Sequence, residues 1–547
     1  MAAQNAVITA AAIIALAIYI IAVYRRSKYF LHMIQLEGYK NKNYLHWLQS
    51  FPHKVFPKKL RSFSLFVIIL FCLYLLVRNN ENTILLLFMG IWCLLTFLSI
   101  DFQKTEAKKA LVFTERAKRL FAINFILVAL PLILLNILYF LPSSYLDYPT
   151  VLLFGTIMLV FVPYMMVLAN ICIAPVEKQV FKFYYNKAYN KVRTFDKLHI
   201  VGITGSYGKT STKFIMAEIL EQKFKVMKTP ESYNTPMGIS KVINNMLNDD
   251  YEAFVVEMGA RQMGDIQEVA RLVNPHIGVL TSIGPTHLET QKTIENIMKT
   301  KYELIECLPE DGIAIFYYDN VYVKELADKT QKRKILYGLE EVERLDIYAA
   351  DIDVSYKGST FVLKDKSGTS VQCTTKLLGK HNISNLLAGA AAAKALGLTM
   401  EEIAKGIERV TPIPHRLQLM NSGTGVIVID DAFNSNPEGA KAALEVLKQF
   451  NEGRKVIVTP GMVELGEQET EANRAFGENI AESCDFAILV GEKRTKPIVE
   501  GLKKKGFNPN NIYVVSNLDD ATKRFQSFIK AGDVILFEND LPDNYNE

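Results

Sequence analysis

Long apolar stretches are the most prominent pattern in the first third of the chain. They occupy residues 6–23, 63–77, 83–100, 120–141 and 149–173. Several approach the roughly 20 residues that an α-helix needs to cross a bilayer, although the second stretch is short and contains Ser64. The pattern predicts an N-terminal α-helical transmembrane region over residues 1–175, with about five helices.

Basic residues gather in two of the predicted loops between these helices. Loops 24–61 and 101–119 carry many lysines and arginines, whereas the opposite side offers Arg78 and almost nothing else. Such basic loops stay in the cytoplasm, so we expect the N-terminus outside and everything after Ile173 inside. A cleaved signal peptide is disfavoured, because an arginine pair follows the first stretch where small residues would be required.

Charge and cysteine content narrow the classes of function. The six cysteines are scattered and include no C-x-x-C pair, which argues against a disulfide framework and a zinc site. The net charge of +5 comes from the membrane-proximal loops, so it indicates contact with lipid headgroups and not with nucleic acid. Residues 27–50, with Trp47 and several tyrosines, leave two alternatives: helices at the membrane interface, or a solvated loop.

A helical connector and an α/β domain are expected next. Residues 176–197 are rich in Lys, Tyr and Phe, which is typical of a helix leaving the membrane. Beyond them, strand and helix patterns alternate, which indicates a parallel sheet covered on both faces. The predicted strands are 198–203, 253–257, 277–281 and 312–316, followed by a β-rich piece near 335–375. We expect this central domain to span residues 198–410.

A second α/β domain is expected at the C-terminal end. Residues 411–414, Thr-Pro-Ile-Pro, form a stiff link that breaks the helical pattern. Another series of alternating strands and helices follows it, without a G-x-G-x-x-G motif, so dinucleotide binding is unsupported. Residues 411–547 are therefore expected to form a Rossmann-like domain.

The most informative short segment is a glycine-rich turn after the first predicted strand. Residues 205–210 have the pattern Gly-x-x-Gly-Lys-Thr and lead into a helix. Such a turn directs backbone N–H groups at a phosphate, while Lys209 adds charge and the Thr210 hydroxyl can bind Mg²⁺. The usual motif has a glycine where this chain has Ile203, so the loop is a shortened variant. A chance turn is the alternative, but the order of strand, turn, Lys-Thr and helix favours a nucleoside triphosphate.

Polar residues also follow two other predicted strands, at the sheet edge where ligands bind in doubly wound folds. Glu257 ends one strand, and a carboxylate there can hold Mg²⁺ near phosphates. His287 follows the next strand, although an isolated histidine is more often a surface or packing residue. Lys299 and Lys301 come after it on a predicted helix, where a charge run is usually a solvated face.

Together these segments resemble the Mur ligase family. The matching segments are 204–211, 257–260, 284–288, 379–385, 430–437 and 461–467. The last two are most similar to the branch that adds D-alanyl-D-alanine to UDP-N-acetylmuramoyl-tripeptide. The resemblance implies an ATP-dependent acid–amino-acid ligase: ATP phosphorylates a carboxylate, an amine attacks the acyl phosphate, and phosphate leaves. A carboxylate is a poor electrophile, and cations neutralise charge on the transferring phosphoryl group.

The resemblance also implies roles for individual residues. The implied catalytic residues are Lys209, Lys301 and His287. The implied metal ligands are Thr210, Glu257, His287 and Lys301 as a carbamate, with Lys299 as the competitor for the carbamate position. The implied ATP-binding residues are Gly205, Ser206, Gly208, Lys209, Thr210, Ser211, Asn382, Asn385, Arg416 and Asp431.

Some of these assignments have structural alternatives. Asn382 and Asn385 resemble adenine-contacting residues, but they could equally cap or pack the Ala-rich helix that follows. Asp431 resembles a ribose-binding aspartate, but either it or Asp430 could cap a turn. Asn234 belongs to a loop that the family places near the phosphates.

Two departures from the family bear on the substrate. Membrane spans stand where family members begin with a domain that binds the UDP end of the substrate, and the C-terminal residues 537–545 lack the usual basic ending. We therefore expect a ligase in a bacterial-type cell (inner) membrane. It would join an amino acid or dipeptide to a carboxylate acceptor, such as a lipid-linked peptidoglycan precursor. Membrane lipids and cell-wall enzymes are the expected partners.

Three other functions are considered. One is a poly-γ-glutamate-type polyamino-acid synthetase, which would produce a glutamate polymer. Another is a catalytically silent ATP-binding membrane scaffold, against which stands the intact set of implied catalytic residues. A transport ATPase is disfavoured because Glu257 stands in place of the usual strand-ending aspartate.

Overall fold

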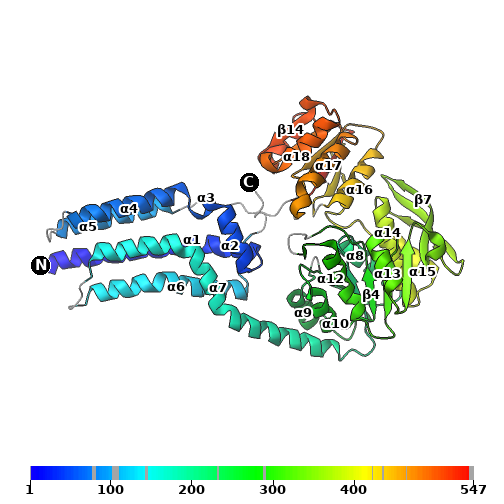
Figure 1. The fold of residues 1–547 in the computed structure, drawn as a ribbon, viewed down its shortest axis with the longest axis horizontal. Helices are drawn as coiled ribbons and strands as arrows, with labels where there is room; N and C mark the ends of the chain where they lie inside the picture. The colour runs from blue at the N-terminus through cyan, green and yellow to red at the C-terminus, as the bar shows by residue number, and fades with distance from the viewer. Residues whose placement is uncertain are drawn as a thin grey trace. The chain divides into compact units, whose positions relative to one another are not determined.

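The computed structural model describes most of the chain, with short gaps. The described residues are 2–76, 82–100, 110–141, 146–230, 233–286, 291–421, 423–433, 436–463 and 465–540. The chain divides between Val180 and Phe181 into two compact units. The first holds the N-terminal helices, and the second holds the alternating strands and helices (Figure 1).

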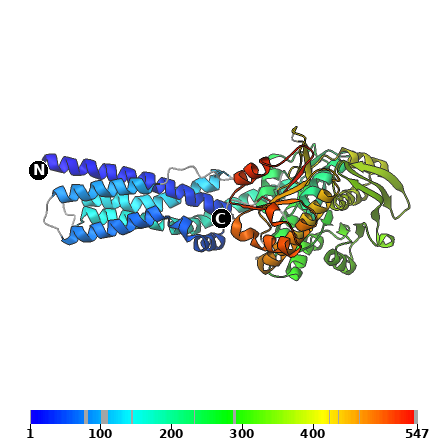
Figure 2. The same ribbon diagram turned by 90° about the horizontal axis from the view of Figure 1, so that it is seen from above.

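Every apolar stretch of the first third lies on a helix. The helices are α1 (Ala2–Leu36), α2 (Asn41–Ser50), α3 (Pro52–Val55), α4 (Lys58–Leu76), α5 (Asn82–Ser99), α6 (Glu115–Tyr139) and α7 (Tyr148–Val192). Helices α1, α4, α5 and α6 run side by side in both views (Figures 1 and 2). The predicted helical region is thus confirmed, while its crossing of a membrane stays a prediction.

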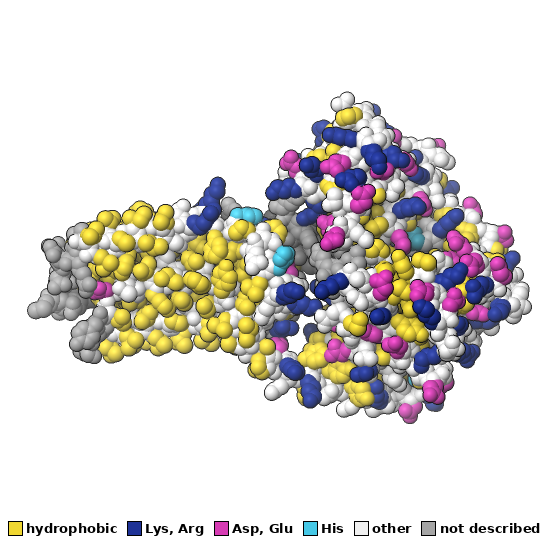
Figure 3. Space-filling view, in the orientation of Figure 1, with side chains coloured by type: hydrophobic (Ala, Val, Ile, Leu, Met, Phe, Trp, Pro, Cys, Tyr) yellow, Lys and Arg dark blue, Asp and Glu magenta, His cyan; other side chains and the backbone are white. Residues whose placement is uncertain are grey.

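Within the part of the chain that the structure describes, four helices are long and apolar enough to cross a membrane. These candidates are Ala6–Leu36, Lys58–Leu76, Glu115–Tyr139 and Tyr148–Val192, and Thr83–Ser99 is a shorter apolar helix. The stretch around Ser64, which was the least secure prediction of a span, therefore lies on a helix that is long and apolar enough to cross a membrane. The next stretch lies on the shorter helix Thr83–Ser99. Hydrophobic side chains cover most of the unit's visible outer face (Figure 3).

The expected basic loop 24–61 is largely helical instead. Helix α1 continues to Leu36, so Arg26 lies inside it. The Arg26 guanidinium donates hydrogen bonds to the carbonyls of Leu159 at 2.7 Å and Val55 at 2.8 Å. Because Pro163 has no N–H, the Leu159 carbonyl lacks its usual helical donor, and the arginine replaces it. These two hydrogen bonds allow the charged guanidinium to lie partly buried among the helices.

The solvated-loop alternative for residues 27–50 is wrong. Helix α2 turns Tyr44, Trp47 and Leu48 inward, where all three are buried against the other helices of the unit. The Tyr44 hydroxyl also donates to the Pro163 carbonyl at 3.2 Å. Its aromatic residues are thus core residues of the first unit.

The connector expected over residues 176–197 is helical as far as Val192, where it forms the last part of a longer helix. Helix α7 runs unbroken from Tyr148 to Val192, through Pro163 and Pro175. Its final turns belong to the second unit, where Ala188 and Val192 are buried in the core.

A nine-stranded sheet forms the first half of the second unit. Its order is β2-β3-β1-β4-β5-β6-β7-β8-β9, parallel from β2 to β7 and antiparallel beyond. The strands are β1 (His199–Thr204), β2 (Val226–Lys228), β3 (Ala253–Glu257), β4 (Ile277–Leu280), β5 (Ile313–Tyr317), β6 (Lys334–Gly338), β7 (Ile347–Ser355), β8 (Gly358–Asp365) and β9 (Ser370–Thr375). The four predicted strands and the β-rich piece are confirmed, and the three-residue β2 was not predicted.

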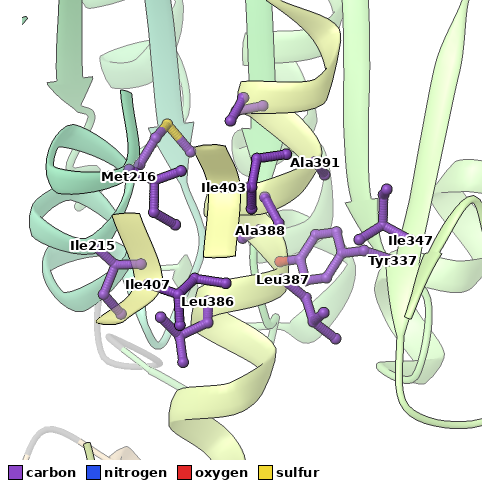
Figure 4. Packing of buried hydrophobic residues seen from close by; sticks show 14 of the residues in the cluster. Ile215, Met216, Tyr337, Ile347, Leu386, Leu387, Ala388, Ala391, Ile403 and Ile407 are labelled. Atoms are coloured by element: carbon purple, nitrogen blue, oxygen red, sulfur yellow. The ribbon is translucent and has the colours of Figure 1, made fainter. Parts of the chain in front are cut away.

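Helices cover this sheet and build its core. They are α8 (Lys209–Leu220), α9 (Pro236–Asn245), α10 (Asp265–Val273), α12 (Ile294–Glu306), α13 (Val321–Lys329), α14 (Lys380–Ala395) and α15 (Met400–Arg409), with the short 3-10 helix η1 (Val342–Arg344). The Ala-rich α14 packs closely on α8, because a Cβ on Gly389 would lie only 3.3 Å from Cγ2 of Ile215. Figure 4 shows buried residues of this core from both helices, among them Ala388 of α14 and Met216 of α8. This contact fixes α14 against the helix that begins at the glycine-rich loop.

The last quarter of the chain forms the expected Rossmann-like sheet. Its order is β10-β11-β15-β12-β13-β14, and only the unpredicted edge strand β10 is antiparallel. The strands are β10 (Gln418–Asn421), β11 (Ile427–Asp431), β12 (Lys455–Thr459), β13 (Phe486–Val490), β14 (Ile512–Val515) and β15 (Val534–Glu538). The helices are α16 (Pro437–Lys448), α17 (Glu469–Ala481), α18 (Glu492–Lys504) and α19 (Leu518–Gln526), with the 3-10 helices η2 (Gly466–Gln468) and η3 (Pro509–Asn511).

Candidate functional site

The glycine-rich loop joins β1 to α8 and leaves the start of the helix accessible. Helix α8 begins at Lys209, and its N-cap residue Gly208 has a left-handed φ of 78°. Gly208 has no side chain to accept hydrogen bonds from the first N–H groups of the helix. Those groups and the positive end of the helix form the kind of phosphate site that the motif predicts.

Two neighbouring side chains leave no room for a Cβ in this loop. A Cβ on Gly205 would lie 2.0 Å from Oγ1 of Thr281, whose hydroxyl donates to the Tyr207 carbonyl at 2.7 Å. A Cβ on Gly208 would lie 2.6 Å from Oδ1 of Asn385. The loop is therefore held from the end of β4 and from α14, and both glycines are required by close approach as well as by backbone conformation.

We expect Gly208→Ala to weaken ADP binding by about tenfold or more, through backbone strain and collision with Asn385. Gly264 offers a matched control, because it is also a left-handed N-cap glycine, at α10, but a Cβ there would meet nothing within 4 Å. Titration with a fluorescent ADP analogue compares the two variants. Equal weakening by Gly264→Ala would show that the collision is irrelevant.

Lys209 folds back over the loop. Its Nζ donates hydrogen bonds to the carbonyls of Gly205 at 2.7 Å and Ser206 at 2.9 Å. Burial lowers the pKa of Lys209 to about 8, although the nearby Glu257 carboxylate opposes the shift. The ammonium thus lies within the loop that is predicted to receive phosphate.

ADP affinity is expected to fall as the pH rises through about 8. Below this pKa Lys209 is a cation that attracts phosphate, and above it the attraction is lost. Bound phosphate stabilises the cation, so Lys209 loses its proton at a higher pH in the complex than in the free protein. Titrations from about pH 7 to about pH 9 test this, and Lys209→Ala should give a flatter profile.

Glu257, the last residue of β3, is the centre of a buried polar cluster. Its Oε2 accepts hydrogen bonds from Thr210 Oγ1 at 3.0 Å and from Lys213 Nζ at 3.2 Å. Its Oε1 accepts a hydrogen bond from Asn234 Nδ2 at 3.1 Å. Burial raises the pKa of Glu257, but the charges of Lys213 and Lys209 outweigh it, and the pKa lies below the ordinary value. The carboxylate is therefore ionised at neutral pH.

This donor set fits magnesium. Thr210 and Glu257 offer hard oxygen atoms, and Mg²⁺ is commonly held by one or two carboxylates together with substrate phosphates. Across the ranges described above, no group of three or more His, Cys, Asp or Glu residues could hold a metal by itself. His287, another predicted ligand, lies outside the described residues. Magnesium binding stays a prediction.

Lys301 and Lys299 differ sharply in environment. Lys301 lies on α12 with only 4% of its surface exposed, and burial, aided by the charge of Lys209, lowers its pKa to about 7. Lys299 is exposed and lines a groove of about 960 Å³ between α10, α12 and α13. The solvated-face alternative thus fails for Lys301 and holds for Lys299. Carbamylation of Lys301 stays a prediction, supported by an amine that is partly neutral at physiological pH.

The two asparagines predicted to contact adenine lie in the first turns of α14. Asn382 Nδ2 donates to the Leu378 carbonyl at 2.9 Å, and its Oδ1 accepts from Asn385 Nδ2 at 3.2 Å. These contacts show the packing role, and the adenine contact stays a prediction. Of the two predicted serines, Ser206 donates its hydroxyl to the Gly284 carbonyl at 3.0 Å, and Ser211 is buried on α8.

Arg416 and Asp431 lie beside each other near the start of the second sheet. Burial lowers the pKa of Arg416, opposed by Asp431 and by Glu257. Asp431 Oδ1 accepts from the Leu417 N–H at 3.1 Å. Asp430 is the aspartate that caps the turn, since its Oδ1 accepts from the N–H two residues on, at 3.1 Å. Contacts of Arg416 and Asp431 with ATP stay predictions.

Sequence reasoning missed two residues of this cluster. Lys213 follows Lys209 by one helical turn, and its side chain is fully buried against Glu257. Thr281 directly follows β4 and holds the glycine-rich loop. A signal for Lys213 was available, because positions four apart share a helix face and Lys209 had already been placed at the site.

Family comparison gives the same assignment as the sequence motifs. The Mur ligase middle domain matches residues 203–393, and the Mur ligase glutamate ligase domain matches residues 415–538. The chain belongs to the Mur ligase family. It is an ATP-dependent ligase that forms C–N bonds.

Similar proteins include enzymes of one branch of this family. The UDP-N-acetylmuramoyl-tripeptide–D-alanyl-D-alanine ligase of Bacillus subtilis is 30% identical over 340 residues, 62% of this chain and 72% of that protein. The Escherichia coli ligase of the same name is 31% identical over 295 residues, 54% of this chain and 65% of that protein. Among solved structures, the MurF ligase of Thermotoga maritima in complex with ADP has a TM-score of 0.58 and 27% identity, and the match covers 66% of this chain and 80% of that one.

Proposed function

We propose that this Mur ligase is a membrane-anchored enzyme that uses Mg²⁺ and ATP to form an amide bond on a peptidoglycan-related precursor. The observation that carries the proposal is the single cluster of Lys209, Thr210 and Glu257, with the buried Lys301 on the adjacent helix. The similar ligases are named for UDP-N-acetylmuramoyl-tripeptide and D-alanyl-D-alanine, which supports a precursor of this class and an amino acid or dipeptide as the amine.

Each residue of the cluster has a part in acyl-phosphate formation. The start of α8 and Lys209 would neutralise the phosphates, since catalysis of phosphoryl transfer depends on positioning and on stabilising charge. Magnesium would be held by Thr210, Glu257, His287 and the Lys301 carbamate, and when bound it polarises phosphoryl and carboxyl oxygens.

The first unit supports an acceptor held at a membrane. Its apolar helices and hydrophobic outer face suit a bilayer (Figure 3). Basic residues gather in the sequence segments 24–61 and 101–119, which favours an N-terminus outside and a cytoplasmic ligase unit. A lipid-linked precursor would then be presented next to ATP.

The test is turnover by the full chain, purified in detergent, measured as phosphate release and as a new amide by mass spectrometry. Reactions contain ATP, Mg²⁺, D-alanyl-D-alanine or single amino acids, and either lipid-linked or UDP-linked muropeptide, with Lys209→Ala as the inactive control. Turnover with the lipid-linked acceptor is expected. Turnover with only the UDP-linked acceptor would overturn the lipid-linked part, and a glutamate polymer or no amide at all would overturn the peptidoglycan assignment.

A further inference from the structure

The buried pair of Lys213 and Glu257 links the glycine-rich loop's helix to the neighbouring strand. The two side chains are 0% and 2% exposed, and Lys213 Nζ lies 3.2 Å from Glu257 Oε2. The ammonium also lies 4.8 Å from the centroid of the Phe214 ring, which favours its charged form by cation–π attraction. The Glu257 carboxylate and the Phe214 ring thus contact the ammonium on two sides.

Stability alone does not explain a pair in this position. Removing two charges from water costs about as much as their attraction returns, so an apolar pair would fill the same space as well. Lys213 contacts Oε2 of Glu257, which also accepts a hydrogen bond from Thr210. The other oxygen of this carboxylate, Oε1, accepts a hydrogen bond from Asn234. Both oxygens of Glu257 are therefore oriented by neighbours.

Lys213 and Lys209 contact different parts of the site. They are one turn apart on α8, but Lys209 donates to the loop carbonyls, whereas Lys213 donates to Glu257. We propose that Lys213 is a positioning residue for magnesium, which holds the Glu257 carboxylate in the orientation that the metal requires. This inference rests on the proposed function, because it takes Glu257 as a ligand of Mg²⁺ bound with nucleotide.

Partners that orient a metal-binding carboxylate commonly contribute 10-fold to 100-fold to metal affinity. We therefore expect Lys213→Met to raise the Mg²⁺ concentration that half-saturates ADP binding by about tenfold or more. ADP affinity without metal should change by less than about twofold, because Lys213 donates to Glu257, whereas Lys209 is the lysine that donates to the loop carbonyls. Calorimetric ADP titrations, in EDTA and at graded Mg²⁺, measure both, and Mn²⁺ binding by electron paramagnetic resonance gives a readout independent of activity.

A double-mutant cycle separates positioning from a general structural role. If Lys213 acts through Glu257, then adding Lys213→Met to Glu257→Gln should change the half-saturating Mg²⁺ no further. The double variant removes both charges of the Lys213–Glu257 pair, so it carries the test even where Lys213→Met alone fails to fold. Lys228→Met is the matched control, because it removes a nearby, partly exposed ion pair with Glu221 and should leave the Mg²⁺ titration unchanged.

Three results would count against the inference. Additive effects in the cycle, or equal losses of affinity with and without metal, would show that Lys213 is only structural. An unchanged Mg²⁺ titration in Lys213→Met would show that it has no role in metal binding. Wild-type protein that binds ADP without any response to Mg²⁺ would overturn the proposed function itself, which is a distinct outcome.

Discussion

Replacement of Lys209 by alanine is expected to reduce ATP turnover by about a thousandfold or more. The lysine is the cation held within the loop, with its Nζ on the carbonyls of Gly205 and Ser206. Loss of a preorganised charge at the transferring phosphoryl group typically costs that much in rate. Phosphate release in the detergent-purified chain, with ATP and an acceptor, measures the effect.

Lys223 supplies a matched control for this variant. Its Nζ also donates to a main-chain carbonyl, that of Gly397 at 2.7 Å, but on the surface and outside the cluster. Lys223→Ala should therefore keep nearly all turnover. Both variants should insert into membranes and melt like wild type, since neither lysine belongs to the first unit. Loss of expression with Lys209→Ala would instead indicate a structural role for that lysine.

The phosphate loop and the sheets were predictable because their signals are local. An apolar strand followed by Gly-x-x-Gly-Lys-Thr specifies both the turn and the start of α8. The strand pattern also placed Glu257 correctly at the end of β3. Such features depend on residues adjacent in sequence, and the structure reproduces them.

Features that depend on distant partners were not predictable. A boundary was expected near residue 175, yet α7 continues, and at Pro163 the exposed carbonyl of Leu159 is satisfied by Arg26 from another helix. For Lys213 the helix face was predictable from its four-residue spacing to Lys209, but its burial was not, since a lysine on a helix is normally solvated. Its burial depends on Glu257 of another strand.

The choice between Lys299 and Lys301 depends partly on local sequence and partly on distant contacts. Residues two apart on a helix point in widely different directions, so the sequence alone shows that both cannot face the site. Which one does depends on how α12 packs on the sheet. The structure buries Lys301 and exposes Lys299.

Lys301→Ala is accordingly expected to lower turnover by about a hundredfold or more, through loss of a carbamate that would bind Mg²⁺. Carbon dioxide reacts with neutral amines, and the pKa of Lys301, about 7, leaves much of this amine neutral at pH 7.5 to 8 and protonated well below pH 7. Turnover in the wild type should therefore fall when carbon dioxide is removed and recover with bicarbonate. A small carboxylate such as formate should partly restore Lys301→Ala, because it can occupy the vacated space as an anion.

Lys299 supplies the matched control that shows which lysine is carbamylated. Lys299→Ala removes an exposed amine from the same helix, so turnover and its dependence on bicarbonate should stay as in wild type. Carbon-13 magnetic resonance after exposure to labelled carbon dioxide should give a carbamate signal in wild type and Lys299→Ala, and none in Lys301→Ala. If the signal follows Lys299 instead, then burial and a lowered pKa do not select the modified residue. If neither variant loses the signal, then the anion that completes the magnesium site comes from another group.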